Sequence, residues 1–193
     1  MKKTALWGQL IFLLFLGRAA LAAPGPVDFA RGALRDLSLA RKEAIQLRVE
    51  RYYDFSALFD RATQDFQAKL SPEESARLRR LFVEAVTRGL AHQADRWNGK
   101  RLSRAELSLE RQEGRESVVA IRGLVDRRPV RIEWTLAPSG DSFKIVDLAV
   151  QGALLSRNYR GPFNRIFRVE GFSGLERRMK RNVETSGIEP PTS

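Results

Sequence analysis

Few side chains in this sequence are suited to catalysis. The chain has 193 residues, no cysteine and one histidine, His92. Cysteine nucleophiles, disulfides and thiolate metal sites are therefore excluded, and a multi-histidine metal centre cannot form. A hydrolase triad would have to use His92, which stands at the end of a predicted helix beside Gln93 and Asp95. A lone histidine there is more often a cation that interacts with the helix dipole.

Acidic pairs and loop motifs add little catalytic potential. Glu73 and Glu74 stand where the first turn of a predicted helix favours negative charge. The sequence contains no glycine-rich phosphate loop, no G-x-S-x-G nucleophile elbow and no cluster of metal ligands. We therefore expect a binding protein and not an enzyme, with no catalytic residue, no metal and no cofactor.

Asp147 is the carboxylate with the most unusual setting. It lies within Phe143–Val150, a segment with the composition of a buried strand, and a carboxylate there needs a hydrogen-bonding partner or water. One interpretation is an ion pair with an arginine that holds a sheet against a helix. The other is that Asp147 orients a functional arginine, for which Arg160 is the nearest candidate in chain order.

The amino terminus has the three parts of a secretory signal peptide. Lys2 and Lys3 supply positive charge, Ala5–Leu16 is mostly apolar, and Ala20–Ala22 fits a cleavage signal. The apolar run is shorter than the roughly 20 residues that span a bilayer. We predict that residues 1–22 are a signal peptide cleaved after Ala22, so that the protein is exported. An uncleaved N-terminal anchor is the alternative.

The charge balance points to an anionic partner. Lys and Arg number 34 against 23 Asp and Glu, which gives a formal net charge of +11. Nucleic acid is the usual partner of a basic domain, but an exported protein rarely meets it. An anionic membrane surface is then the better candidate. The alternative is that the excess arginine only keeps the protein soluble.

The elements that must position these residues begin with helices. Apolar spacing predicts helices over Asp28–Leu39 and Glu43–Tyr53. Asp54 can cap a third helix, whose apolar positions recur at a helical period over Phe55–Leu70. The segment Ser71–Glu74 combines an N-cap serine, a proline at the first helical position and a capping-box glutamate, which predicts the start of a fourth helix.

Strands follow, and then helices again. From Ala105 the apolar period changes to two, and four such segments separated by turn residues predict an antiparallel meander that ends with Phe143–Val150. Asn158 can cap a helix that Gly171 ends, and Ser173 can cap another. We predict a single α+β domain over residues 23–183 and a disordered polar tail over residues 184–193.

Several of these segments resemble one known family. Phe143–Gly152 followed by Asn158–Phe163 resembles the signature of the MlaC-like periplasmic phospholipid-binding proteins, also called the toluene-tolerance auxiliary family. Tyr53–Phe55 and the helix start at Leu70–Glu73 resemble two further segments of that family. The resemblance covers roughly Asp28 to Met179. It implies an α+β fold in which a bent antiparallel sheet, here four-stranded, and about five to six helices enclose an apolar pocket.

The resemblance also implies a function. Such a protein is a periplasmic phospholipid carrier, the soluble component of an intermembrane lipid transport system that is linked to an ABC transporter and maintains outer-membrane lipid asymmetry. The expected partners are a phospholipid or related lipid, an inner-membrane ABC transporter with its MCE-domain protein, and an outer-membrane lipoprotein–porin complex, with no nucleic acid. Two alternatives remain: an NTF2-like cone-fold enzyme that uses Asp147, His92 or Tyr159, and an exported protein-binding adaptor.

A soluble carrier must hide the acyl tails of its lipid. Exposing roughly 30 methylenes to water costs on the order of 20 kcal/mol, so we expect apolar side chains of the sheet and helices to surround the tails. Tyr159 and Arg160 are candidates for the headgroup, because a guanidinium can bind phosphate oxygens in bidentate fashion. The predicted ligand-binding residues are Phe55, Phe59, Phe66, Phe82, Ile132, Trp134, Leu136, Val146, Leu148, Tyr159, Arg160 and Phe163.

Overall fold

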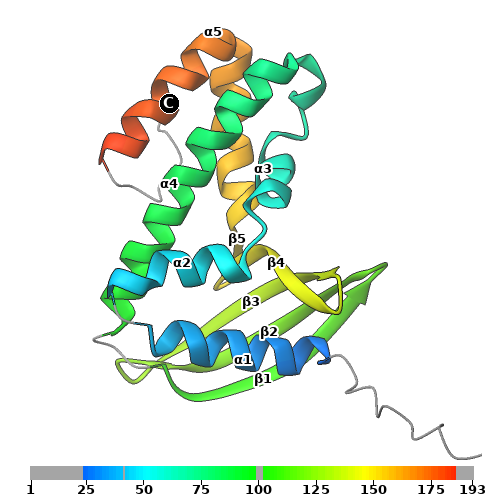
Figure 1. The fold of residues 1–193 in the computed structure, drawn as a ribbon, viewed down its shortest axis with the longest axis vertical. Helices are drawn as coiled ribbons and strands as arrows, with labels where there is room; N and C mark the ends of the chain where they lie inside the picture. The colour runs from blue at the N-terminus through cyan, green and yellow to red at the C-terminus, as the bar shows by residue number, and fades with distance from the viewer. Residues whose placement is uncertain (1–23, 41, 99–101, 186–193) are drawn as a thin grey trace, which may run out of the picture.

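A computed structural model describes residues 24–40, 42–98 and 102–185 (Figure 1). The predicted signal peptide and residues 186–193 of the predicted tail lie outside the described residues. Four helices and one turn of 3-10 helix precede the sheet: α1 (Pro26–Ser38), α2 (Lys42–Tyr52), α3 (Phe55–Thr63), η1 (Gln67–Lys69) and α4 (Pro72–Asn98). Helix α5 (Leu155–Thr185) follows it.

The sheet is antiparallel, with its strands in sequence order. The five strands are β1 (Ser103–Glu113), β2 (Glu116–Val125), β3 (Arg128–Ser139), β4 (Ser142–Val150) and β5 (Ala153–Leu154). The α+β class and the meander are confirmed, but the prediction of four strands was wrong by one. Strand β5 has two residues, which pair with Ala149 and Val150, and a segment of that length shows no apolar period.

The sheet and α1 form one end of an elongated molecule, and α4 and α5 extend to the other end (Figure 1). Helix α1 lies along the sheet and contacts β1, β2 and β4, and α2 contacts β4 and α4. Helix α4 begins at the end of the molecule far from the sheet and runs toward the sheet, and it packs against α3 and α5. None of the helices in the described ranges has the length and apolar character needed to cross a membrane.

One face of the sheet belongs to the hydrophobic core. Ile132, Trp134 and Leu136 alternate along β3 and are all buried, as the period of two predicts. The register of β4 against β3 shifts by one residue at Val146. Because of this bulge, Ile145 as well as Leu148 joins the core cluster.

The predicted helix starts are confirmed at the two strongest capping signals. The Oδ1 atom of Asp54 accepts a hydrogen bond from Ala57 N at 2.9 Å. Ser71 and Glu74 form the reciprocal capping box: Ser71 N donates to Glu74 Oε2 at 2.9 Å, and Glu74 N donates to Ser71 Oγ at 3.1 Å. Local side-chain chemistry is therefore enough to begin α3 and α4.

Two helix boundaries differ from the predictions. Helix α3 ends at Thr63 and not near Leu70, because the chain changes there to a turn and then to η1. Helix α5 begins at Leu155, so that Asn158 lies inside it and is not its cap. The predicted stop at Gly171 is confirmed, since φ 64° and ψ −165° at this residue interrupt the helical conformation and divide α5 into two arms (Figure 1).

Candidate functional site

Eleven of the twelve predicted ligand-binding residues are buried, with relative exposures from 0% to 8%. Ten of these eleven belong to the hydrophobic cluster that joins the sheet to the helices, and the other is Val146 at the bulge of β4. Arg160 is the member of the set with a substantial exposed fraction, 41% of its side chain. These eleven side chains therefore lie in the interior, whereas a role in binding a ligand stays a prediction.

An aromatic group occupies the junction of α3, α4 and α5. The ring of Phe82, on α4, lies 5.6 Å from that of Phe59 on α3 and 5.1 Å from that of Tyr159 on α5, measured between centroids. Phe163 lies 6.1 Å from Phe82 and 5.4 Å from Tyr159. These separations fall in the range of favourable edge-to-face contacts. The helical side of the predicted site is thus a set of rings in mutual contact.

The sheet side meets the helices where α2 gives way to α3. Asp54 N donates a hydrogen bond to Ile145 O on β4 at 2.9 Å, which attaches the chain between α2 and α3 to the sheet. The neighbouring rings of Tyr53 and Phe55 stack with centroids 5.6 Å apart. Burial raises the pKa of Tyr53, and the nearby indole of Trp134 on β3 offsets this only in part. Tyr53 therefore stays neutral and bridges the two layers.

Tyr159 and Arg160 have opposite environments although they are adjacent in the chain. Tyr159 is 1% exposed, and its burial raises the pKa of the phenol. Arg160 lies at the surface, where its Nε donates to Asp65 Oδ2 at 2.7 Å and a second guanidinium nitrogen reaches Asp65 Oδ1. The hydrogen bonds from Arg160 and Asn164 lower the pKa of Asp65. Tyr159 thus packs inside the molecule, and Arg160 is the one of the two that a headgroup in solvent can reach.

Asp147 binds backbone N–H groups and not an arginine. It is 1% exposed, and its Oδ1 accepts hydrogen bonds from Leu148 N at 2.8 Å and from Ser156 N at 3.2 Å. Its Oδ2 has no hydrogen-bond partner among the described residues. Within the described ranges no arginine lies within ion-pair distance of Asp147: Arg160 binds Asp65, the charge of Arg61 acts on Asp147 only from farther away, and Asp147 caps the first turn of α5. Desolvation raises the pKa of Asp147, and the hydrogen bonds from Ser156 and Leu148 oppose that rise.

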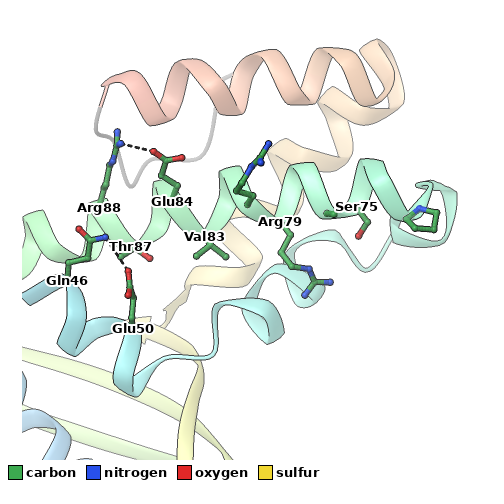
Figure 2. Close-up of a pocket in the computed structure, with 11 residues that line it drawn as sticks. Gln46, Glu50, Ser75, Arg79, Val83, Glu84, Thr87 and Arg88 are labelled. Atoms are coloured by element: carbon green, nitrogen blue, oxygen red, sulfur yellow. Dashed lines mark hydrogen bonds and ion pairs between the residues drawn. The ribbon is translucent and has the colours of Figure 1, made fainter.

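A surface groove of about 880 Å³ follows α4, with α2 along one side (Figure 2). Gln46 and Glu50 of α2 lie beside Thr87 of α4, and Gln46 donates to Glu50 at 3.2 Å. Thr87 is 2% exposed and its hydroxyl has no hydrogen-bond partner within the described ranges. None of the twelve predicted residues lines this groove.

Ion pairs neutralise two of the arginines that line this groove. Arg88 pairs with Glu84 at 2.6 Å, and Arg79 pairs with Asp60 at 2.7 Å while its guanidinium lies 4.9 Å from the centroid of the Phe59 ring. The α4 residues that line the groove are separate from the apolar stripe that periodicity predicts for this helix. Polar residues that recur at helical spacing between Ser75 and Arg88 are the feature of the sequence that indicates this groove.

A second groove, of about 360 Å³, lies between α1, the end of α2 and the β3–β4 turn. Its aromatic lining consists of Phe29, Tyr52 and Phe143, and Phe29 contacts the other two rings at centroid distances of 6.0 and 5.8 Å. Lys144 and Arg51 line it as well. Within the part of the chain that the structure describes, no group of three or more acidic or histidine side chains is arranged to hold a metal ion.

Taken together, these features define a small α+β protein whose apolar sheet face is covered by helices. The family model described as MlaC protein matches residues 33–181, so the chain belongs to the MlaC family. The resemblance inferred from the sequence is thereby confirmed. A search of curated proteins finds no match.

The fold is also similar to that of a solved structure. The phospholipid-binding protein from Ralstonia solanacearum, solved in complex with a phospholipid, superimposes with a TM-score of 0.68. The match covers 83% of this chain and 97% of that chain, at 16% sequence identity. At this level of identity the similarity establishes a shared fold.

Proposed function

We propose that this protein is a phospholipid carrier that works in the periplasm. The observation that supports it most is the combination of MlaC family membership with a fold that matches, over 83% of this chain, that of a protein solved in complex with a phospholipid. The signal-peptide pattern at residues 1–22 supports export. The finer proposal is that the protein serves an intermembrane transport system that is linked to an ABC transporter.

The buried apolar residues supply the chemistry that the proposal needs. Acyl tails must leave water when the lipid leaves a membrane, and each buried methylene is worth about 0.8 kcal/mol. The apolar face of the sheet, with Trp134 and Leu136, and the rings around Phe82 on the helices can both contact hydrocarbon. Because the rings of the helical group contact one another, a tail that enters among them has to replace those contacts. The net free energy of loading from a bilayer is then small, which favours both uptake and release.

The enzyme alternative has weaker support. An NTF2-like active site would need Asp147 or Tyr159 to face a cavity, but neither residue lines either of the two grooves. Asp147 caps a helix, and Tyr159 lies among aromatic rings. His92 lies in α4, outside the residues whose side chains are described.

The proposal is tested by lipid uptake. Protein stripped of lipid is incubated with vesicles that contain a labelled phospholipid, separated from them, and analysed for the label. We expect stable uptake by the wild type and its loss in Trp134→Ala. Leu175→Ala removes a buried apolar side chain of α5 outside the predicted set and is the matched control for destabilisation, since both changes cost several kcal/mol. No uptake by the wild type, or equal loss in both variants, would contradict the proposal.

A further inference from the structure

The first arm of α5 carries three arginines on one exposed face. Arg157, Arg165 and Arg168 are all exposed and precede the interruption at Gly171. At about 100° per residue, their spacing of eight and three positions places them within about 80° of one another around the helix axis. We call these three residues the α5 arginine face.

The α5 arginine face differs from Arg160 on the same arm because ion pairs do not neutralise its charges. Among the described residues, Arg157, Arg165 and Arg168 have no carboxylate within ion-pair distance and no side-chain hydrogen bond, whereas Arg160 on the same arm pairs with Asp65. Two acidic residues of α5 whose side chains the structure describes, Glu170 and Glu176, are already engaged with other cations. Glu170 binds Arg177 and Arg178, and Glu176 binds Arg77 and Lys180.

Local helix stability does not account for this arrangement. Arg157 lies in the first turn of α5, where the positive end of the helix dipole disfavours a cation. The turn contains no acidic residue of its own. Burial does not account for it either, because all three side chains belong to exposed residues. Three unpaired positive charges in a row therefore indicate an anionic partner outside the molecule.

We propose that the α5 arginine face docks the protein on the surface of an anionic phospholipid membrane. The three arginines span about 16 Å of a straight helix, which suits a flat array of phosphates. Each guanidinium can bind phosphate oxygens in bidentate fashion. Val169, which is 78% exposed next to Arg168, adds one apolar side chain at the edge of this face.

A membrane fits this face better than an acidic protein does. Stable protein interfaces are centred on buried aromatic or aliphatic anchors, and the face itself presents only the three arginines with Gly161 between them. Electrostatic attraction to anionic lipid contributes roughly fivefold in affinity for each arginine near the surface. The resulting attachment is weak and reversible. This inference goes beyond the proposed carrier function and does not depend on which lipid is carried.

The test is cosedimentation of the protein with vesicles. Vesicles of phosphatidylglycerol and phosphatidylcholine in equal parts are compared with vesicles of phosphatidylcholine alone. We expect binding to the anionic vesicles only, and a loss on the order of 100-fold in the triple variant Arg157→Gln, Arg165→Gln, Arg168→Gln. High salt should abolish wild-type binding, because the Debye length falls from about 10 Å at 0.1 M to about 3 Å at 1 M.

A matched triple variant separates this face from net charge. Arg115, Arg127 and Arg128 are also exposed, stand at turns of the sheet and have no ion pair among the described residues, so their replacement by Gln removes the same charge elsewhere. This control should bind nearly as well as the wild type. Equal loss in the two triple variants, unchanged binding of the α5 variant, or equal binding to neutral vesicles would overturn the proposal.

A second readout separates docking from lipid carriage. The thermal unfolding midpoint and the lipid content of the α5 variant, measured by mass spectrometry, should match those of the wild type. Loss of vesicle binding with unchanged lipid content supports docking by this face and leaves the carrier function intact. Loss of bound lipid together with a lowered unfolding midpoint would show a structural role and would overturn the proposal.

Discussion

Asp147 on β4 accepts a hydrogen bond from the backbone N–H of Ser156, in the first turn of α5, at 3.2 Å. The two residues are nine positions apart, and the short strand β5 lies between them. This contact sets the start of α5 against the sheet. The positions of Tyr159 and Phe163 in the aromatic group therefore depend on a carboxylate that belongs to a strand.

Replacing Asp147 by alanine should destabilise the fold. The change removes the acceptor for Leu148 N and Ser156 N. We expect a loss of about 2 kcal/mol in the free energy of unfolding. The loss is not larger because the variant no longer has to bury a carboxylate. Asp147→Asn should lose less, since an amide oxygen can still accept at the Oδ1 position. Urea denaturation of both variants checks this. Equal stability of Asp147→Ala and the wild type would show that the cap contributes nothing.

Asp147 should make a contribution to the free energy of unfolding that falls as the pH rises. Desolvation raises the pKa of this carboxyl in the folded protein above its ordinary value of 3.8. The folded state then binds the proton more tightly than the unfolded state, so this group lowers stability as pH rises through the window between the two pKa values. Asp147→Asn should lack this component. The check is to measure the free energy of unfolding of both proteins in steps from pH 4 to pH 7. A difference between wild type and variant that stays constant over this range would refute the raised pKa of Asp147.

Gly171 should resist substitution because of its backbone conformation. Its φ of 64° and ψ of −165° belong to a region that is open almost only to glycine. Gly171→Ala should cost about 1–3 kcal/mol in the free energy of unfolding. Gly161→Ala is the control, because Gly161 lies within the helix with no atom within 4 Å of the added methyl group, and it should stabilise by about 0.5–1 kcal/mol. Similar effects of the two changes would argue against the break at Gly171.

Arg160 and Asp65 allow a test of the predicted headgroup contact. Arg160→Glu places a carboxylate beside Asp65 and should reduce retention of an anionic phospholipid. Asp65→Asn removes the charge that Arg160 now pairs with and should preserve retention. Lipid content after purification measures both effects. If Arg160→Glu carries as much lipid as the wild type, Arg160 does not belong to the binding site.

The sequence predicts the parts of this fold that depend on local chemistry. The caps at Asp54 and Ser71, the alternation along β3 and the stop at Gly171 each involve residues within a few positions of one another. The start of α5 at Leu155 was missed, because its cap is Asp147, a residue of another element. The two-residue strand β5 was missed because it exists only through its pairing with β4.

The candidate site, like the fold, has features that the sequence predicts and features that it does not. Periodicity predicts that residues such as Phe82 and Trp134 are buried, and the structure confirms this. The partner of Arg160 could not be predicted, since Asp65 lies 95 residues away in the chain. The separation of Tyr159 from Arg160 follows from how α5 packs on α3 and α4, which only the three-dimensional structure defines.

The most direct test of the account is the mass of the protein as it leaves a bacterial cell. The full chain is expressed with its own amino terminus, purified without detergent and measured by native mass spectrometry, then denatured so that any released lipid can be identified. We predict a species heavier than the polypeptide by the mass of one diacyl phospholipid, which denaturation releases. A polypeptide that carries no amphiphile, and that takes up none when mixed with phospholipid vesicles, would contradict the account.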